Sequence, residues 1–80
     1  MQIRPHTTLN FNKRYVGKNI WILLSPKNTK DVFLYPNDYL LRKFAERGII
    51  KETKSYQKKD YNISRVSKTV RDMLNEFKIN

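Results

Sequence analysis

Residues 18–35 read KNIWILLSPKNTKDVFLY and decide the fold. The eight residues at the start, 18–25, and the four at the end, 32–35, are rich in β-branched and aromatic side chains, which favour strands. The residues between them, 26–31, begin with proline and end with aspartate, and both residue types favour turns. The stretch therefore predicts a β-hairpin with a basic turn.

The hairpin carries apolar side chains on both of its faces. Because successive residues of a strand point to opposite sides, Trp21 lies on the face opposite to Ile20 and Ile22. In the second strand Phe33 and Tyr35 share a face. Two short helices can cover only one face of the sheet. The other face is then either covered by the N-terminal segment or left open, with Trp21, Phe33 or Tyr35 as stacking or docking residues.

Two later segments have the periodicity of helices. The first spans residues 38–47, where the apolar residues form one stripe, Asn37 is placed to cap the start and Gly48 follows the end, as a left-handed residue often does. The second, which Asn62 would cap, is marked by one apolar face over about four turns. The residues of that face are Ile63, Val66, Val70, Met73, Leu74 and Phe77.

The remaining segments complete the predicted fold. Residues 7–12 alternate polar and apolar side chains and predict a further strand. Residues 49–56 predict an edge strand, since charged side chains accompany the apolar ones, and residues 57–60 predict a solvated loop. The element order is then (β)ββαβα. We expect one α+β domain over residues 1–80, with an antiparallel or mixed sheet and two helices packed mainly on one face.

The composition narrows the class of protein. The chain has 80 residues and a formal net charge of +10, from 17 Lys and Arg against 7 Asp and Glu. Such an excess attracts nucleic acid or another anionic surface, although charge can also serve solubility alone. No cysteine occurs, which excludes disulfides, thiolate metal sites and a cysteine nucleophile.

Neither a membrane span nor a secretory signal is visible. The longest apolar run, residues 20–24, has five residues, whereas a helix needs about 20 to span a bilayer. The N-terminus lacks the apolar core of a signal peptide. We therefore expect a soluble, cytoplasmic protein with no membrane partner.

Residues suited to catalysis are sparse. The single histidine, His6, has no carboxylate near it in the sequence, and neither glycine lies in a phosphate-binding loop. Asp31 with Glu52 and Lys54 matches the D…ExK pattern of metal-dependent nucleases, but a predicted helix intervenes, and E-x-K is common in a lysine-rich chain. We expect no enzyme activity, no catalytic residue, no metal site and no cofactor.

Three basic stretches are candidates for phosphate contacts: the hairpin turn, the segment between the helices and the second helix. In the first helix the basic residues follow an acid, which is the order that the helix macrodipole favours. In the second helix Arg65, Lys68 and Arg71 precede the acids, and this reversed order favours an anion site. The alternative is a solvated face with a Lys68–Asp72 ion pair.

The candidate nucleic-acid-binding residues are Lys27, Lys30, Lys51, Lys54, Lys58, Lys59, Arg65, Lys68 and Arg71. Tyr56 and Tyr61 lie among them and are candidates for stacking on bases. Lysine outnumbers arginine 11 to 6. Because arginine is the usual bidentate reader of guanine, this ratio favours contacts with the phosphate backbone.

Two classes of function remain. The leading hypothesis is a small non-enzymatic nucleic-acid-binding protein, such as a regulator or accessory factor of a phage or mobile element. Lys, Asn, Ile and Tyr supply 31 of the 80 residues, and their A/T-rich codons are common in such genomes. The alternative is a protein-binding inhibitor or adaptor that docks on a host nucleic-acid machine, such as an RNA polymerase or a CRISPR nuclease. A ribonucleoprotein component is a third reading, and DNA or RNA and the oligomeric state are left open.

Overall fold

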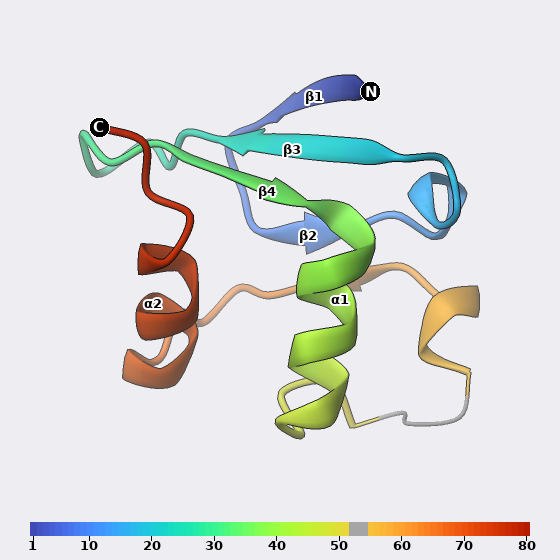
Figure 1. Ribbon diagram of the computed structural model, residues 1–80. Helices are drawn as coiled ribbons and strands as arrows, with labels where there is room; N and C mark the ends of the chain where they lie inside the picture. Colours follow the sequence, from blue (N-terminus) through green and yellow to red (C-terminus); the bar gives the residue numbers. More distant parts are fainter. Residues whose placement is uncertain (52–54) are drawn as a thin grey trace.

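The predicted hairpin lies at the centre of a three-stranded sheet. In the computed structural model, which describes residues 1–51 and 55–80, β3 (Ile20–Leu24) pairs antiparallel with β4 (Phe33–Pro36). On its other side β3 pairs in parallel with β1 (Gln2–His6), so that the strand order is β1-β3-β4 (Figure 1). The sheet is therefore mixed.

Strand β1 is an element absent from the predicted order. Its sequence QIRPH alternates between polar and apolar residues, but the run is short and four of its five residues are exposed. The strand contains Pro5, which an edge strand tolerates because it needs ladder hydrogen bonds on one side only. This segment forms a strand because it pairs with the strongly apolar β3, and not because of its own composition.

A crossover beneath the sheet joins β1 to β3, as a parallel pair requires. It contains β2 (Asn10–Phe11), which pairs antiparallel with β5 (Tyr61–Asn62), and the 3₁₀ helix η1 (Lys13–Tyr15). The strand predicted over residues 7–12 is thus present as two residues only. Its partner β5 lies where the sequence predicted the start of a helix.

Helix α1 (Asn37–Glu46) follows β4 directly and differs from its predicted bounds by one residue at each end. Gly48 has a φ of 74°, the left-handed conformation predicted after the helix. The predicted cap is wrong, because Asn37 is the first helical residue and Pro36 stands at the N-cap position. The Asn37 side-chain amide instead donates to Asp38 Oδ1 at 3.2 Å.

Helix α2 (Lys68–Asn75) is shorter than predicted at both ends. Ser67 is its N-cap, and Ser67 Oγ accepts a hydrogen bond from the backbone N–H of Val70 at 3.3 Å. The predicted cap, Asn62, belongs to β5. Ile63 also pairs outside the helix, because its N–H donates to Leu9 O at 2.8 Å. Pairing with a distant segment therefore replaces the first predicted turns of helix.

The edge strand predicted over residues 49–56 is not present in the described part of that range. The N–H groups of Ile49 and Ile50 both donate to Phe44 O, at 3.0 and 3.3 Å, and Ile50 is buried. The apolar pair therefore closes the end of α1 against the core. Tyr56 begins a second 3₁₀ helix, η2 (Tyr56–Lys58).

The C-terminal segment takes the outer edge of β4. Leu34 N–H donates to Phe77 O at 3.0 Å, Ile79 N–H donates to Val32 O at 2.9 Å, and Phe33 forms a bridge with Lys78. This pairing covers an edge that would otherwise be open to another chain.

The core lies between one face of the sheet and the helices, which are all on the same side of it (Figure 1). Phe11 of the crossover packs edge-on against Phe44 of α1, with ring centroids 5.3 Å apart. The sheet contributes the buried side chains of Ile20, Ile22, Leu24, Phe33 and Tyr35. The predicted α+β fold, with both helices on one face of a mixed sheet, is confirmed.

Tyr35 provides a test of this packing. Its ring is fully buried, its hydroxyl has no hydrogen-bond partner among the described residues, and burial raises the pKa of that hydroxyl. A buried hydroxyl without a partner costs about 1–3 kcal/mol. We expect Tyr35→Phe to raise the free energy of unfolding by about 1 kcal/mol in urea denaturation. Tyr39→Phe, at a half-exposed ring, should change it by less than about 0.5 kcal/mol. A clear loss of stability in Tyr35→Phe would contradict this account.

Candidate nucleic-acid interface

The hairpin turn and α2 lie at the same end of the molecule (Figure 1). A pocket of about 650 Å³ is lined both by the turn and by the segment that leads into α2. The turn contributes Pro26 and Thr29 to its wall, the segment before α2 contributes Ser64 and Val66, and α2 contributes Arg71. We call this hollow the turn–α2 pocket. It brings together two basic stretches that are far apart in the sequence.

Arg71 lines this pocket, and four more exposed basic residues of the predicted set lie within two residues of its lining residues along the chain. Lys27 and Lys30 alternate along the turn with the wall residues, and Arg65 lies between Ser64 and Val66. Lys68 and Arg71 follow on α2, and none of the five forms an ion pair with another residue in the described part of the chain. We call Lys27, Lys30, Arg65, Lys68 and Arg71 the basic rim.

The start of α2 adds to the positive potential of the rim. Lys68 is the first helical residue, and the first turn contains no acid, so nothing in that turn offsets the positive end of the macrodipole. Arg65 was expected within the helix, but it lies before the cap residue Ser67. The possible Lys68–Asp72 ion pair is absent from the contacts of the described residues. The predicted reversal of charge order therefore holds for Lys68 and Arg71 but not for Arg65.

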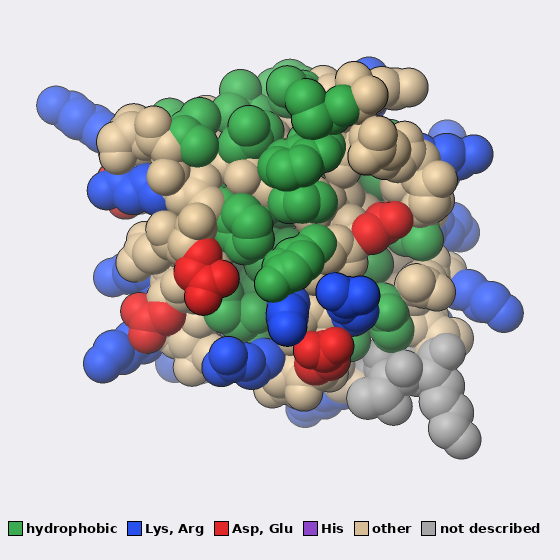
Figure 2. Space-filling model, viewed as in Figure 1, with side chains coloured by type: hydrophobic (Ala, Val, Ile, Leu, Met, Phe, Trp, Pro, Cys, Tyr) green, Lys and Arg blue, Asp and Glu red, His purple; other side chains and the backbone are tan. Residues whose placement is uncertain are grey.

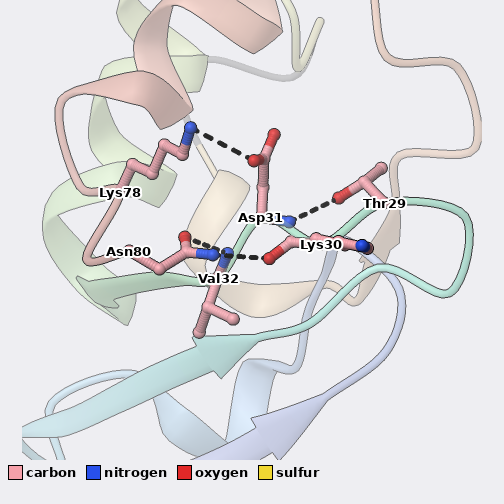
Figure 3. A network of polar contacts seen from close by, with 6 residues as sticks. All are labelled: Thr29, Lys30, Asp31, Val32, Lys78 and Asn80. Carbon is pink, nitrogen blue, oxygen red and sulfur yellow. Dashed lines mark hydrogen bonds and ion pairs between the residues drawn. The ribbon is translucent and has the colours of Figure 1, made fainter.

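The one acid among the wall residues described for the pocket, Asp31, is already paired. Its carboxylate lies 3.2 Å from Lys78 Nζ, and its backbone N–H donates to Thr29 Oγ1 at 2.9 Å (Figure 3). The contact with Lys78 compensates the charge of Asp31. The charge of the rim is therefore not cancelled from within the pocket wall.

The C-terminal residue holds the turn in place. Asn80 Oδ1 accepts from the backbone N–H of Val32 at 2.8 Å, and the Asn80 amide donates to Lys30 O (Figure 3). Both bonds go to backbone groups at the end of the turn, and the Lys30 side chain extends away from Asn80 and Lys78 (Figure 3). The turn is thus fixed by its backbone while its ammonium group stays exposed.

The third predicted stretch does not join the basic rim. Lys51, Lys58 and Lys59 are exposed, and η2, which contains Lys58, lies at the end of the molecule opposite to α2 (Figure 1). Lys54 lies outside the described residues, as does Glu52 of the D…ExK pattern. The hydrogen bond from Lys13 N to Asp60 Oδ1, 2.7 Å long, ties this region to η1.

The structure adds two basic residues that sequence reasoning missed, Lys13 and Arg14. Both are exposed in η1, beside the loop that carries Lys58 and Lys59 (Figure 1). The acid-free composition of residues 1–30 was the one signal that pointed to them.

The expected stacking residues differ in exposure. Phe33 and Tyr35 are 5% and 0% exposed, so their rings belong to the core and present no open ring face for stacking, although Phe33 also lines the turn–α2 pocket. Tyr56 and Tyr61 are half-buried and pack against that core. Trp21 alone of the five lies on the opposite face of the sheet, where it is half-buried.

That opposite face is apolar and open. Trp21 is in register with Ile3 and Pro36, and residues in register share a face. Both helices and the β2–β5 pair lie on the other side of the sheet (Figure 1). The N-terminal segment therefore widens the sheet and does not cover it. We call this surface the outer face, and its residues are Ile3, Pro5, Trp21, Leu23, Leu34 and Pro36.

Arg42 and Lys43 of α1 are engaged by side chains of their own helix. Arg42 and Lys43 lie over the Tyr39 ring, 5.6 and 5.5 Å from its centroid, and both contact the Glu46 carboxylate. Tyr39 in turn packs edge-on against Phe77. Figure 2 shows the result on this side of the molecule, where hydrophobic side chains gather in the middle and most basic side chains lie toward the edges.

Among residues 1–51 and 55–80, no group of three His, Asp or Glu side chains is placed to hold a metal ion. Partial burial lowers the pKa of His6, whose ring packs beside Tyr15. No helix in that part of the chain is long and apolar enough to cross a bilayer.

No family model, no curated protein and no solved structure matches this chain.

Proposed function

We propose that this protein binds nucleic acid through the basic rim and catalyses no reaction. The observation that carries the proposal is the convergence of the hairpin turn and the 64–71 segment on one pocket. Lysine and arginine side chains neutralise backbone phosphates and release their counterions, which is the main source of affinity in non-specific binding. Basic groups grouped around a hollow also focus the electrostatic field more than scattered ones do.

The placement of several acids supports this proposal. Asp38 Oδ2 accepts from Gly17 N at 2.8 Å, and Asp60 Oδ1 accepts from Lys13 N at 2.7 Å. Glu46 pairs within α1, and Asp31 pairs with Lys78. These four acids stabilise turns, a helix and the C-terminal segment, and none of them pairs with a residue of the rim.

The salt dependence of binding tests the size of the rim. If all five rim residues contact phosphates, the log of the association constant should fall with the log of the salt concentration with a slope of about −4. Fluorescence anisotropy with a labelled oligonucleotide, titrated at several salt concentrations, measures this slope. A slope shallower than about −1 would reject the rim as a phosphate-binding surface.

Two triple variants separate the rim from the other basic helix. We expect Arg65→Ala with Lys68→Ala and Arg71→Ala to weaken binding and to reduce the salt slope by about 3, because each lost phosphate contact removes about one unit. These side chains are exposed and unpaired in the described structure, so the melting temperature should stay the same or rise slightly.

The matched control changes the three basic residues of α1, Arg42, Lys43 and Arg47, to alanine. This variant keeps the same net charge as the rim variant but loses the contacts with Tyr39 and Glu46. It should lose stability, by less than about 1 kcal/mol for each exposed pair, and keep most of its binding. Equal loss of binding in both variants would show that net charge, and not the rim, determines affinity.

The outer face supports a second candidate function, the docking of a protein. It presents Trp21, which is half-buried, and Ile3, which is 46% exposed, and aromatic side chains carry much of the energy of protein interfaces. We propose a partner whose contact surface is apolar at its centre and acidic around it. Complementary charge favours such a partner over a second copy of this chain, which would bring another +10.

Trp21→Ala tests this second function. Because Trp21 is only half-buried, the variant should fold, and iodide should quench the wild-type tryptophan fluorescence in part. When each chain is used to capture proteins from nuclease-treated lysate, the wild type and the rim triple variant should both bind an acidic protein. The Trp21→Ala variant should not bind it. Retention by all three chains, or concentration-dependent dimers in sedimentation, would contradict the proposed partner.

A further inference from the structure

The pocket that the basic rim surrounds is apolar inside. Leu24 and Phe33 of the sheet and Leu74 of α2 form part of its wall, with Val66, which is 45% exposed. A purely electrostatic surface would have no use for an apolar hollow at its centre. The combination of apolar wall and cationic rim therefore suits a ligand with apolar and anionic parts side by side.

We propose that the turn–α2 pocket receives an unstacked base of a single-stranded nucleic acid, while the basic rim contacts the phosphates on either side. This inference rests on the proposed nucleic-acid-binding function and adds the form of nucleic acid to it. In a duplex the base faces are stacked inside and the surface consists of phosphates, sugars and groove edges. A single strand can turn an apolar base face toward the wall of the pocket without the cost of breaking a base pair.

The size of the pocket fits this ligand. Its volume of about 650 Å³ lies within the range of about 300–1,000 Å³ that is typical of sites for small organic molecules. A base with its sugar is a ligand of this kind. A duplex docked on the rim would instead span the opening and leave the apolar wall facing water, at the usual cost of exposed apolar surface.

The polar groups of the wall suit the edge of a base. Thr7, Asn62 and Ser64 line the pocket, and their side chains make no hydrogen bond to another residue in the described structure. Hydroxyl and amide groups can both donate and accept, as the mixed donors and acceptors of a base edge require. Two further hydroxyls already accept internal bonds, Thr8 from Asn10 and Thr29 from Asp31.

Arg71 connects the two parts of the site. It belongs both to the wall and to the rim, and it has no ion pair among the described residues. A guanidinium group can stack on a base through its planar face and bind a phosphate through its N–H groups. Arg71 is therefore placed to contact the base in the pocket and its phosphate together.

The experiment compares three ligands at one salt concentration: a single-stranded oligonucleotide, its duplex, and a strand of the same length whose central nucleotides lack bases. We expect the single strand to bind at least about tenfold more tightly than the other two, since stacking of one base contributes about 1–3 kcal/mol. The abasic strand keeps its phosphates and should keep the same salt slope. Anisotropy measures all three affinities.

A pair of matched variants locates the effect. Val66→Ser removes an exposed apolar group of the pocket, and Ile3→Ser removes one of equal exposure, 46% against 45%, from the outer face. We expect Val66→Ser to weaken binding of the single strand several-fold and to leave the duplex and the abasic strand unchanged. Ile3→Ser should change none of the three.

The outcomes separate this inference from the function on which it rests. Equal affinity for all three ligands with a steep salt slope would overturn base insertion and leave phosphate binding by the rim in place. An equal loss of affinity for the single strand in Val66→Ser and Ile3→Ser would also overturn base insertion. Absence of binding to every ligand at low salt would overturn the proposed function itself.

Discussion

The structure depends on burying one face of the central hairpin. Ile20, Ile22 and Leu24 of β3 and the rings of Phe33 and Tyr35 of β4 share this face, and α1, α2 and the β2–β5 crossover all pack on it. Burial of large apolar side chains is the main term that stabilises so short a chain. The described helices all pack on that side of the sheet. The residues of the same strands that point the other way are equally apolar, and they therefore remain on the outer face. The open surface around Trp21 is thus a direct consequence of how the core is covered.

The C-terminal segment links the core to the candidate nucleic-acid interface. Residues 77–79 complete the edge of β4, and Asn80 and Lys78 then hold the hairpin turn by hydrogen bonds and an ion pair. This closure sets the turn beside the segment before α2 and so creates the turn–α2 pocket. The basic rim and the outer face share no residue. The two proposed functions therefore do not compete for the same side chains.

Local patterns were sufficient for the hairpin strands and for α1, whose bounds are within about two residues of those expected. They failed where pairing between distant segments overrides them. Ile63 and Val66 have helical spacing with Val70, but the N–H of Ile63 bonds to Leu9, and β5 pairs with β2. Strand β1 is short, mostly exposed and contains Pro5, and it forms because β3 offers it an edge. The pair Ile49 and Ile50, expected in a strand, closes α1 instead, since the edge of β4 is already taken by the C-terminal segment.

The candidate site, like the fold, could be predicted only in part from the sequence. Net charge, the identity of the basic residues and the position of the basic turn can all be read along the chain, because they are properties of single residues and short windows. The turn that carries Lys27 and Lys30 lines the same pocket as the 64–71 segment. This grouping depends on contacts between segments that no local pattern records. The same is true of the aromatic residues: alternation placed Trp21 opposite to Ile20 and Ile22, but which face would be buried depended on the side where the helices packed. A sequence lists the groups that can bind, whereas their grouping on one surface arises from long-range pairing and burial.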